Sequence, residues 1–216
     1  MNVYSNPNIG IFLRSNDNYV LIPQGISKNK INIIKKYLDV SSLTTSIGGS
    51  HLIGALTAMN NNAIMVSKLT ENYEIKKIEK QTGLNVVKLE SKFTAIGNLI
   101  AANDKGAIVS TLLTEKNVKQ ISESLQVPVK KMNISSINLV GALINATNKG
   151  AIVHPGITEK EISIVSEVLK VNVEPATVNS GTPYVSSGII ANSKNILVGN
   201  QTSGPELLIL SKAFGI

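Results

Sequence analysis

The side chains that most often carry out catalysis are scarce in this sequence. It has no Cys, which excludes a thiolate nucleophile, a thiolate metal site and disulfides. Its two His residues are His51 in GGSHLIG and His154 in IVHPG, and neither has a carboxylate close to it in sequence. We therefore expect both to be hydrogen-bonded structural residues, and we predict no catalytic residue, no metal site and no cofactor.

The glycines and carboxylates also fit structural roles. The segment IGGSHLIG (47–54) is rich in glycine, but the chain has neither a GxGxxG nor a GxxxxGK[ST] pattern. We expect these glycines to permit close approach of neighbouring backbones. The acidic residues Asp104, Glu71, Glu115 and Glu159 fall where turns or first helical turns are expected, positions that the helix dipole favours.

The charge of the chain fits either a polyanionic partner or simply a soluble basic protein, and by itself it chooses no partner. Its formal net charge is +7 and 43% of its residues are hydrophobic. A basic surface favours nucleic acid or an acidic membrane, but the lysines are spread along the chain. The longest stretch without a charged residue, 40–67, is broken by polar residues and makes a poor membrane span, and the N-terminus does not resemble a signal peptide. We predict no membrane association, and the absence of Cys fits a reducing compartment.

A repeated segment sets the fold. NDKGAIVSTLLTEK (103–116) returns as TNKGAIVHPGITEK (147–160), and an apolar residue followed by Gly within a strand-like run marks each copy. The markers are Ile9-Gly10, Ile53-Gly54, Ile96-Gly97, Val140-Gly141 and a weaker Ser187-Gly188, at spacings of 44, 43, 44 and 47 residues. Five repeats therefore fill the chain, and we place them at 1–50, 51–92, 93–135, 136–178 and 179–216.

Each repeat predicts the same order of elements. Two apolar runs flank a polar turn, which indicates a β-hairpin, and an amphipathic helix and a further short strand follow. The predicted N-caps of the five helices are Ser27, Thr70, Thr114, Thr158 and either Ser203 or Gly204, with a capping box at Thr158 and Glu161. A unit this small cannot bury its own apolar face, so the copies must pack on one another. Because both end repeats keep the pattern, we predict a single α/β domain, 1–216, closed into a five-fold pseudo-symmetric ring with helices outside and strands towards the axis.

Such a ring resembles the pentein fold (α/β-propeller), which includes guanidine-modifying enzymes with a Cys nucleophile. The chain more specifically resembles the translation initiation factor 6 family in its archaeal form. The resemblance rests on segments that occur in the family's order over nearly the whole chain: NIGIF (8–12), HLIGAL (51–56), TAIGN (94–98), NDKGAIV (103–109), KGAIVHPGIT (149–158), LKVNVEPATVNSG (169–181) and TSGPELLILSKAF (202–214).

The resemblance implies a function that composition does not. Members of the family bind the intersubunit face of the large ribosomal subunit, at a ribosomal protein of the uL14 type near the sarcin–ricin loop of the rRNA, and block association with the small subunit. It implies a cytoplasmic, monomeric protein of ribosome biogenesis and translation initiation that is no enzyme. Two alternatives remain: a pentein-type enzyme acting on guanidino or other small cationic substrates, which the missing Cys disfavours, and a generic RNA-binding protein.

The resemblance also implies ribosome-binding residues. The family's binding position in the GN motif matches Asn98, which by residue type alone would be a polar strand residue beside a hairpin. We expect Asn60, Asn103 and Lys105, in the next turns, to lie on the same edge of the ring, with Asn98 and Lys105 exposed. Eukaryotic relatives tend to have Arg where this chain has Ala55, so an ionic contact is not expected there.

Overall fold

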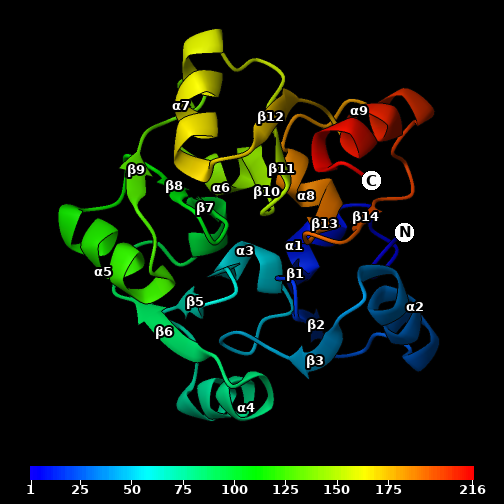
Figure 1. Ribbon diagram of the computed structural model, residues 1–216. Helices are drawn as coiled ribbons and strands as arrows, with labels where there is room; N and C mark the ends of the chain where they lie inside the picture. The colour runs from blue at the N-terminus through cyan, green and yellow to red at the C-terminus, as the bar shows by residue number, and fades with distance from the viewer.

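Five similar units surround a central axis in the computed structural model, which describes residues 1–216 (Figure 1). Each unit contributes a small sheet and an outer helix of 11 residues, and the predicted five-fold ring is confirmed. The outer helices are α2 (Lys28–Leu38), α4 (Asn72–Thr82), α5 (Glu115–Leu125), α7 (Glu159–Leu169) and α9 (Gly204–Phe214). None of the helices is long and apolar enough to cross a membrane.

The sheets follow the predicted order of hairpin, helix and strand. In the first four units the second strand pairs antiparallel with the first and parallel with the strand that follows the outer helix. The strands are β1 (Arg14–Ser15), β2 (Tyr19–Pro23) and β3 (Ser41–Thr45); β4 (Thr57–Met59), β5 (Ala63–Ser67) and β6 (Asn85–Leu89); β7 (Ile100–Ala102), β8 (Ala107–Val109) and β9 (Val129–Lys131); β10 (Ile144–Ala146), β11 (Gly150–Val153) and β12 (Asn172–Pro175); and β13 (Ile189–Ala191) with β14 (Ile196–Val198).

The segment around each marker glycine is a single helical turn, where the sequence pattern suggested strand. These inner turns are α1 (Ile9–Phe12), α3 (Ile53–Leu56), η1 (Ile96–Asn98), α6 (Val140–Leu143) and α8 (Val185–Gly188). Each turn leads into the first strand of its hairpin. A turn of three or four residues is too short to show a helical period, which is why the pattern did not distinguish turn from strand.

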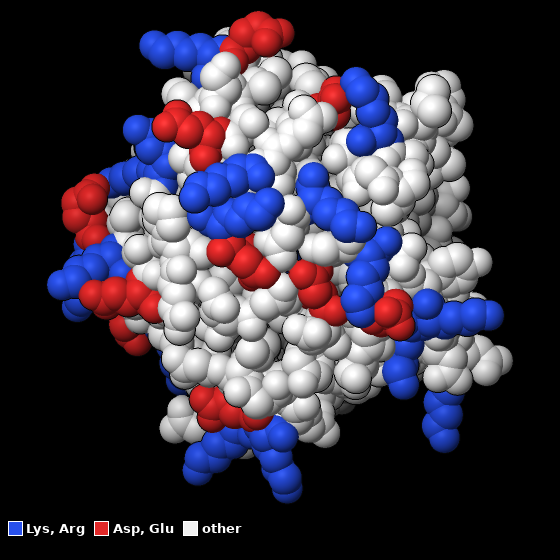
Figure 2. All heavy atoms as spheres, in the orientation of Figure 1, with Lys and Arg blue, Asp and Glu red and all other residues white.

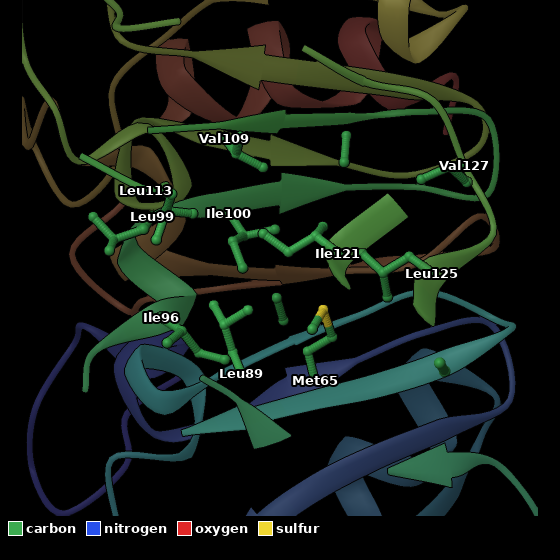
Figure 3. Packing of buried hydrophobic residues seen from close by; sticks show 13 residues of the cluster. Met65, Leu89, Ile96, Leu99, Ile100, Val109, Leu113, Ile121, Leu125 and Val127 are labelled. Atoms are coloured by element: carbon green, nitrogen blue, oxygen red, sulfur yellow. The ribbon is translucent and has the colours of Figure 1, made fainter. Parts of the chain in front are cut away.

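The core is divided into clusters that bridge neighbouring units. In one cluster Met65 of β5 and Leu89 of β6 pack with Ile121 and Leu125 of α5, although the first two belong to the second unit and the others to the third (Figure 3). Each outer helix therefore buries its apolar face partly against the preceding unit. A single unit would leave that face exposed, so the units depend on one another for burial of their apolar surface.

The N-terminal residues close the ring. The fifth sheet has only β13 and β14. The amino group of Met1 donates to the Val198 carbonyl at 2.7 Å, and the Asn200 N–H donates to the Met1 carbonyl at 2.7 Å. Val3 is fully buried with Leu197 in the cluster between the last unit and the first. The N-terminus thus takes the place of the strand that the fifth unit lacks.

The outer helices begin mostly where the sequence predicted. Ser27, Thr114, Thr158 and Ser203 are N-caps, and Thr158 forms the predicted capping box with Glu161. In the second unit the N-cap is Glu71, one residue later than predicted, because the Thr70 hydroxyl donates to the Ser67 carbonyl instead.

Glu206, in the first turn of α9, connects that helix to the preceding loop through hydrogen bonds. Its carboxylate accepts hydrogen bonds from the N–H groups of Ser203 at 2.7 Å and Gly181 at 2.9 Å, and from the Thr177 hydroxyl at 2.7 Å. Burial opposes ionisation of this carboxyl, but these hydrogen bonds outweigh it and lower its pKa to about 2.

Candidate functional site

The ring has two different faces. Each hairpin runs from an inner helical turn, along its first strand, to the polar turn at the other end. The inner turns therefore gather on one face, which we call the Asn98 face, defined by one equivalent residue from each unit: Ile11, Ala55, Asn98, Ala142 and Ser187. The hairpin turns 15–18, 60–62, 103–106, 147–150 and 192–195 gather on the opposite face, which we call the hairpin face.

The predicted binding residues do not lie together. Strand β7 separates Asn98 from Asn103, so Asn98 lies on its own face, whereas Asn60, Asn103 and Lys105 lie on the hairpin face. The prediction of one shared edge is wrong. A hairpin turn lies one strand length from the residues that precede the strand, and the sequence distance between Asn98 and Asn103 hid this separation.

Asn60 and Asn103 are structural residues, 3% and 4% exposed. The Asn103 amide donates to the carbonyls of Thr147 and Leu169 in the next unit, both at 2.9 Å, and its oxygen accepts the N–H groups of its own turn. Asn60 does the same one unit earlier, donating to the carbonyls of Asn103 and Leu125. A buried amide with all its hydrogen bonds made holds neighbouring units in register and is not free to bind a partner.

Lys105 is also less free than predicted. It is partly buried, and its ammonium group donates to the carbonyls of Asn148 at 2.9 Å and Lys170 at 3.2 Å. The Lys170 carbonyl belongs to the C-cap of α7, where a cation interacts favourably with the helix dipole. Reversing this charge would therefore disturb the junction between two units as well as the surface.

The hairpin face carries a closed ring of hydrogen bonds that the sequence did not reveal. The second or third residue of each polar turn donates its backbone N–H to the side chain of its equivalent in the next unit, and the last donates back to the first. The members, in order, are Asp17, Asn61, Asp104, Asn148 and Ser193, and the five donor–acceptor distances are 3.0, 2.8, 2.9, 3.4 and 2.7 Å. The amides of Asn61 and Asn148 also each donate to both carboxylates.

This ring keeps Asp17 ionised. Burial opposes its ionisation, but hydrogen bonds from Ser193, Asn61 and Asn148 outweigh burial and hold the pKa of this carboxyl below its ordinary value. The hint in the sequence was the recurrence of Asp, Asn or Ser at one position of all five turns. Because those residue types are common in any turn, the recurrence alone did not predict a connected network.

Asn98 differs from the other predicted residues in having a free side chain. It ends the turn η1, and its N–H donates to the Ala95 carbonyl at 3.1 Å. Asn98 is partly buried, and so less exposed than predicted, where a row of small cavities along the ring axis begins; we call this row the channel. Its side-chain amide makes no hydrogen bond within the chain. In the fifth unit the equivalent residue is Ser187, because Ser186 takes the place of the marker glycine that the sequence spacing assigned to Gly188.

Close packing of the inner turns fixes the position of Asn98. A Cβ atom built on Gly97 would lie 2.1 Å from the Gly54 carbonyl oxygen, and one built on Gly54 would lie 1.9 Å from that of Gly10. Gly10 meets Ser186 in the same way, at 2.0 Å. Among the glycines of 47–54 that we expected to permit close approach, Gly54 does so here and Gly48 approaches the Leu69 backbone, whereas Gly49 has no atom within 4 Å and instead adopts a positive φ of +71°. The inner turns together form a closely packed collar around the channel.

Exposed apolar side chains surround this collar. Leu52, Leu139 and Tyr184 cap three of the inner turns and are 42%, 37% and 41% exposed. Leu112, 40% exposed, follows Ser110, whose N–H donates to the Leu99 carbonyl just after Asn98. Large exposed apolar groups that converge on one face are typical of a binding surface for another macromolecule.

The two histidines take part in loop structure. The Nδ1 atom of His154 accepts a hydrogen bond from the Gly156 N–H at 2.9 Å, as expected for a structural residue. The His51 ring stacks on Tyr4, with ring centroids 5.5 Å apart. The two side chains therefore support the structure of two separate loops.

The arrangement of the Asn98 face suits recognition of a partner through shape and apolar contact.

Comparison with known proteins identifies the same family over nearly the whole chain. The model of the eIF-6 family matches residues 1–213. The protein named translation initiation factor 6 from Nitrosopumilus maritimus is 52% identical over 212 residues, covering 98% of this chain and 96% of that protein. Its namesake from Cenarchaeum symbiosum is 48% identical over 212 residues, with 98% and 96% covered.

Among solved structures, a dimethylarginine dimethylaminohydrolase in adduct with S-methyl-L-thiocitrulline superposes with a TM-score of 0.50 at 13% identity, covering 78% of this chain and 68% of that one. At this identity the likeness concerns the fold alone, which is the pentein fold.

Proposed function

The chain belongs to the eIF-6 family, a family of translation initiation factors, and we propose that it binds the large ribosomal subunit and prevents premature association with the small one. The proposed mechanism is steric. The rigid ring occupies part of the surface on which the small subunit would dock, and no bond is made or broken.

The Asn98 face is the proposed contact surface. The observation that supports it is the free amide of Asn98 within a collar of exposed apolar side chains. Desolvated apolar and aromatic anchors supply most of the binding energy in protein interfaces, and a polar group among them sets register. We propose that a ribosomal protein of the uL14 type meets this face, near the sarcin–ricin loop of the rRNA.

The charge of the chain fits a site beside rRNA. The net charge is +7, and Figure 2 shows Lys and Arg side chains interspersed with Asp and Glu on the drawn face. Positive charge accelerates encounter with a polyanion, while mixed signs limit tight binding to any RNA. We propose that the protein acts in the cytoplasm, where ribosomal subunits meet.

Cosedimentation with separated ribosomal subunits tests the proposal. We expect saturable binding to large subunits and no saturable binding to small subunits. A generic RNA-binding protein would instead bind both, with an affinity that falls steeply as salt is raised. Equal binding to both subunits would refute the proposed function.

Two substitutions locate the contact surface. Asn98→Ala removes the free amide and gives this unit the residue that two other units carry as Ala55 and Ala142, so the fold is expected to remain intact. Leu112→Glu places a charge among the apolar groups, and we expect it to weaken binding about tenfold, equivalent to about 1.4 kcal/mol. The matched control is Asn195→Glu, which makes the same change of charge at an exposed position of the hairpin face.

A further inference from the structure

Arg14 is the single arginine of the chain, and it lies inside the ring. It is on β1 and lines two small cavities on the axis, one in the middle of the channel and one at the Asn98 face, each about 30 Å³ in volume. The residue is partly accessible. Arg14 therefore lies beside both cavities, between the Asn98 face and the middle of the channel.

This guanidinium has no partner in the protein. It forms no ion pair and donates no hydrogen bond to any group of the chain. Neither of the two cavities is lined by a carboxylate. Asp17 and Asp104 lie farther along, at the hairpin end of the axis, where Asn61 and Asn148 already bridge them.

Burial alone lowers the pKa of Arg14, to about 10, so the group is fully charged at neutral pH. A desolvated charge without a counter-charge is unfavourable, and an ordered anion would relieve it.

A second group in the same cavity is also unsatisfied. The Asn145 oxygen Oδ1 is buried without a hydrogen-bond partner, and its Nδ2 makes only a long contact of 3.5 Å with the Ser186 hydroxyl. A flip of the Asn145 amide would exchange these two atoms and place an N–H donor where the unpaired oxygen lies, at the edge of the cavity that Asn145 lines. Arg14 and Asn145 are equivalent positions in the first and fourth units, and the other units carry the apolar residues Ala58, Ala101 and Ile190 there.

We propose that the axial channel binds one small inorganic anion, of about the size of chloride, between the guanidinium of Arg14 and the amide of Asn145. The donors are the N–H groups of these two side chains. The volume of about 30 Å³ admits one or two water-sized occupants. The anion would neutralise the only cation on the axis and stabilise the closed ring.

The collar of inner turns favours a free ion over an acidic side chain of a partner. The glycines bring neighbouring backbones into contact, and a Cβ built on Gly141 would lie only 2.2 Å from the Gly97 carbonyl oxygen. The opening of the channel at the Asn98 face is therefore narrow. A side chain entering on a macromolecular backbone would need a wider opening. This site is independent of the proposed function, since a ring that does not bind ribosomes could still hold the ion.

Thermal unfolding in matched salts tests the proposal. Sodium chloride is titrated into the protein against sodium gluconate, whose anion is too large for the cavity, at constant ionic strength. We expect a saturable rise in Tm of roughly 2–4 °C at about five times the dissociation constant. Chloride-35 line broadening, reversed by bromide, reports the bound ion directly.

The Arg14→Ala variant tests whether Arg14 binds an anion or only supports the fold. Ala is the natural residue at Ala58 and Ala101, so the variant is expected to fold, and Arg14→Met preserves the bulk of the side chain. Both should lose the chloride response and be at least as stable as the wild type in gluconate, because an unpaired buried charge has been removed. Lys149→Ala, an exposed control on the hairpin face, should keep the response.

Two results would overturn the proposal. One is a wild-type protein whose Tm and chloride line width do not saturate, which means that water alone fills the channel. The other is an Arg14→Ala variant that keeps the wild-type chloride response.

Discussion

Asn103 offers a quantitative test of how the ring is held together. Its buried amide makes four hydrogen bonds of 2.9–3.0 Å, two within its own turn and two to the next unit. Thr147, its equivalent in the fourth unit, accepts the same two bonds within its turn through its hydroxyl. Asn103→Thr should therefore remove only the two bonds between units, whereas Asn103→Ala should remove all four.

The expected losses follow from these counts. At about 1 kcal/mol for each buried hydrogen bond, Asn103→Thr should lower the free energy of unfolding by about 2 kcal/mol and Asn103→Ala by about 4 kcal/mol. For a chain of this length these losses correspond to Tm reductions of roughly 4–8 °C and 8–16 °C. Both variants should still bind large subunits at temperatures where they are folded, because Asn103 lies away from the Asn98 face.

Urea unfolding followed by far-UV circular dichroism measures these losses without relying on tryptophan, which the chain lacks. Wild-type unfolding midpoints for both variants, or equal losses of unfolding free energy for Asn103→Thr and Asn103→Ala, would contradict this role of Asn103. A folded Asn103→Thr that no longer binds large subunits would restore Asn103 as a contact residue and refute our assignment.

Two further predictions concern packing and pH. Gly54→Ala should destabilise the ring by more than about 3 kcal/mol, because its Cβ would lie 1.9 Å from the Gly10 carbonyl oxygen and 2.7 Å from that of Leu13. Gly204→Ala is the control, because a Cβ there has no atom within 4 Å, and it should be neutral or slightly stabilising. Calorimetry measures the stability of both variants. Glu206 has its pKa lowered from 4.5 to about 2, so its contribution of about 3 kcal/mol is complete above pH 4.5 and is lost as the pH falls towards 2. Glu206→Gln should lose that stability at neutral pH and flatten the acid limb of the pH–stability profile; an unchanged acid limb would contradict this assignment.

The sequence predicted the architecture well because five copies report the same pattern. One hairpin signal such as NDKG (103–106) is weak by itself, but its recurrence at nearly constant spacing establishes the unit and requires the units to pack on one another. The inner turns were missed because three or four residues are too few to show a helical period. The role of Met1 and Val3 was missed because it depends on the two chain ends meeting, which is a property of the closed ring.

The site was only partly predictable. Asn98 was predicted as a contact residue through resemblance to a family, and its free amide and its place in an exposed apolar collar became visible only in three dimensions. Asn60 and Asn103 carry the same residue type in a similar setting, yet they are buried. Side-chain type does not reveal which way an amide points, and only the packing of adjacent units decides whether its donors meet backbone carbonyls or solvent.

The surroundings of Arg14 also could not be predicted from its residue type. In sequence it is one basic residue in a basic chain, and its isolation from every carboxylate follows from where the strand β1 lies in the ring. Its equivalents, Ala58, Ala101, Asn145 and Ile190, could be aligned only after the hairpin turns had fixed the register of all five units.

Light scattering during subunit joining measures whether the Asn98 face keeps ribosomal subunits apart, as we propose. Purified large subunits are incubated with the wild-type protein, Leu112→Glu or Asn195→Glu, and small subunits are then added. We predict that the wild type and Asn195→Glu suppress joining equally, while Leu112→Glu requires about ten times more protein for the same effect. Joining that proceeds unchanged with the wild-type protein, or that is relieved by Asn195→Glu and not by Leu112→Glu, would contradict the account.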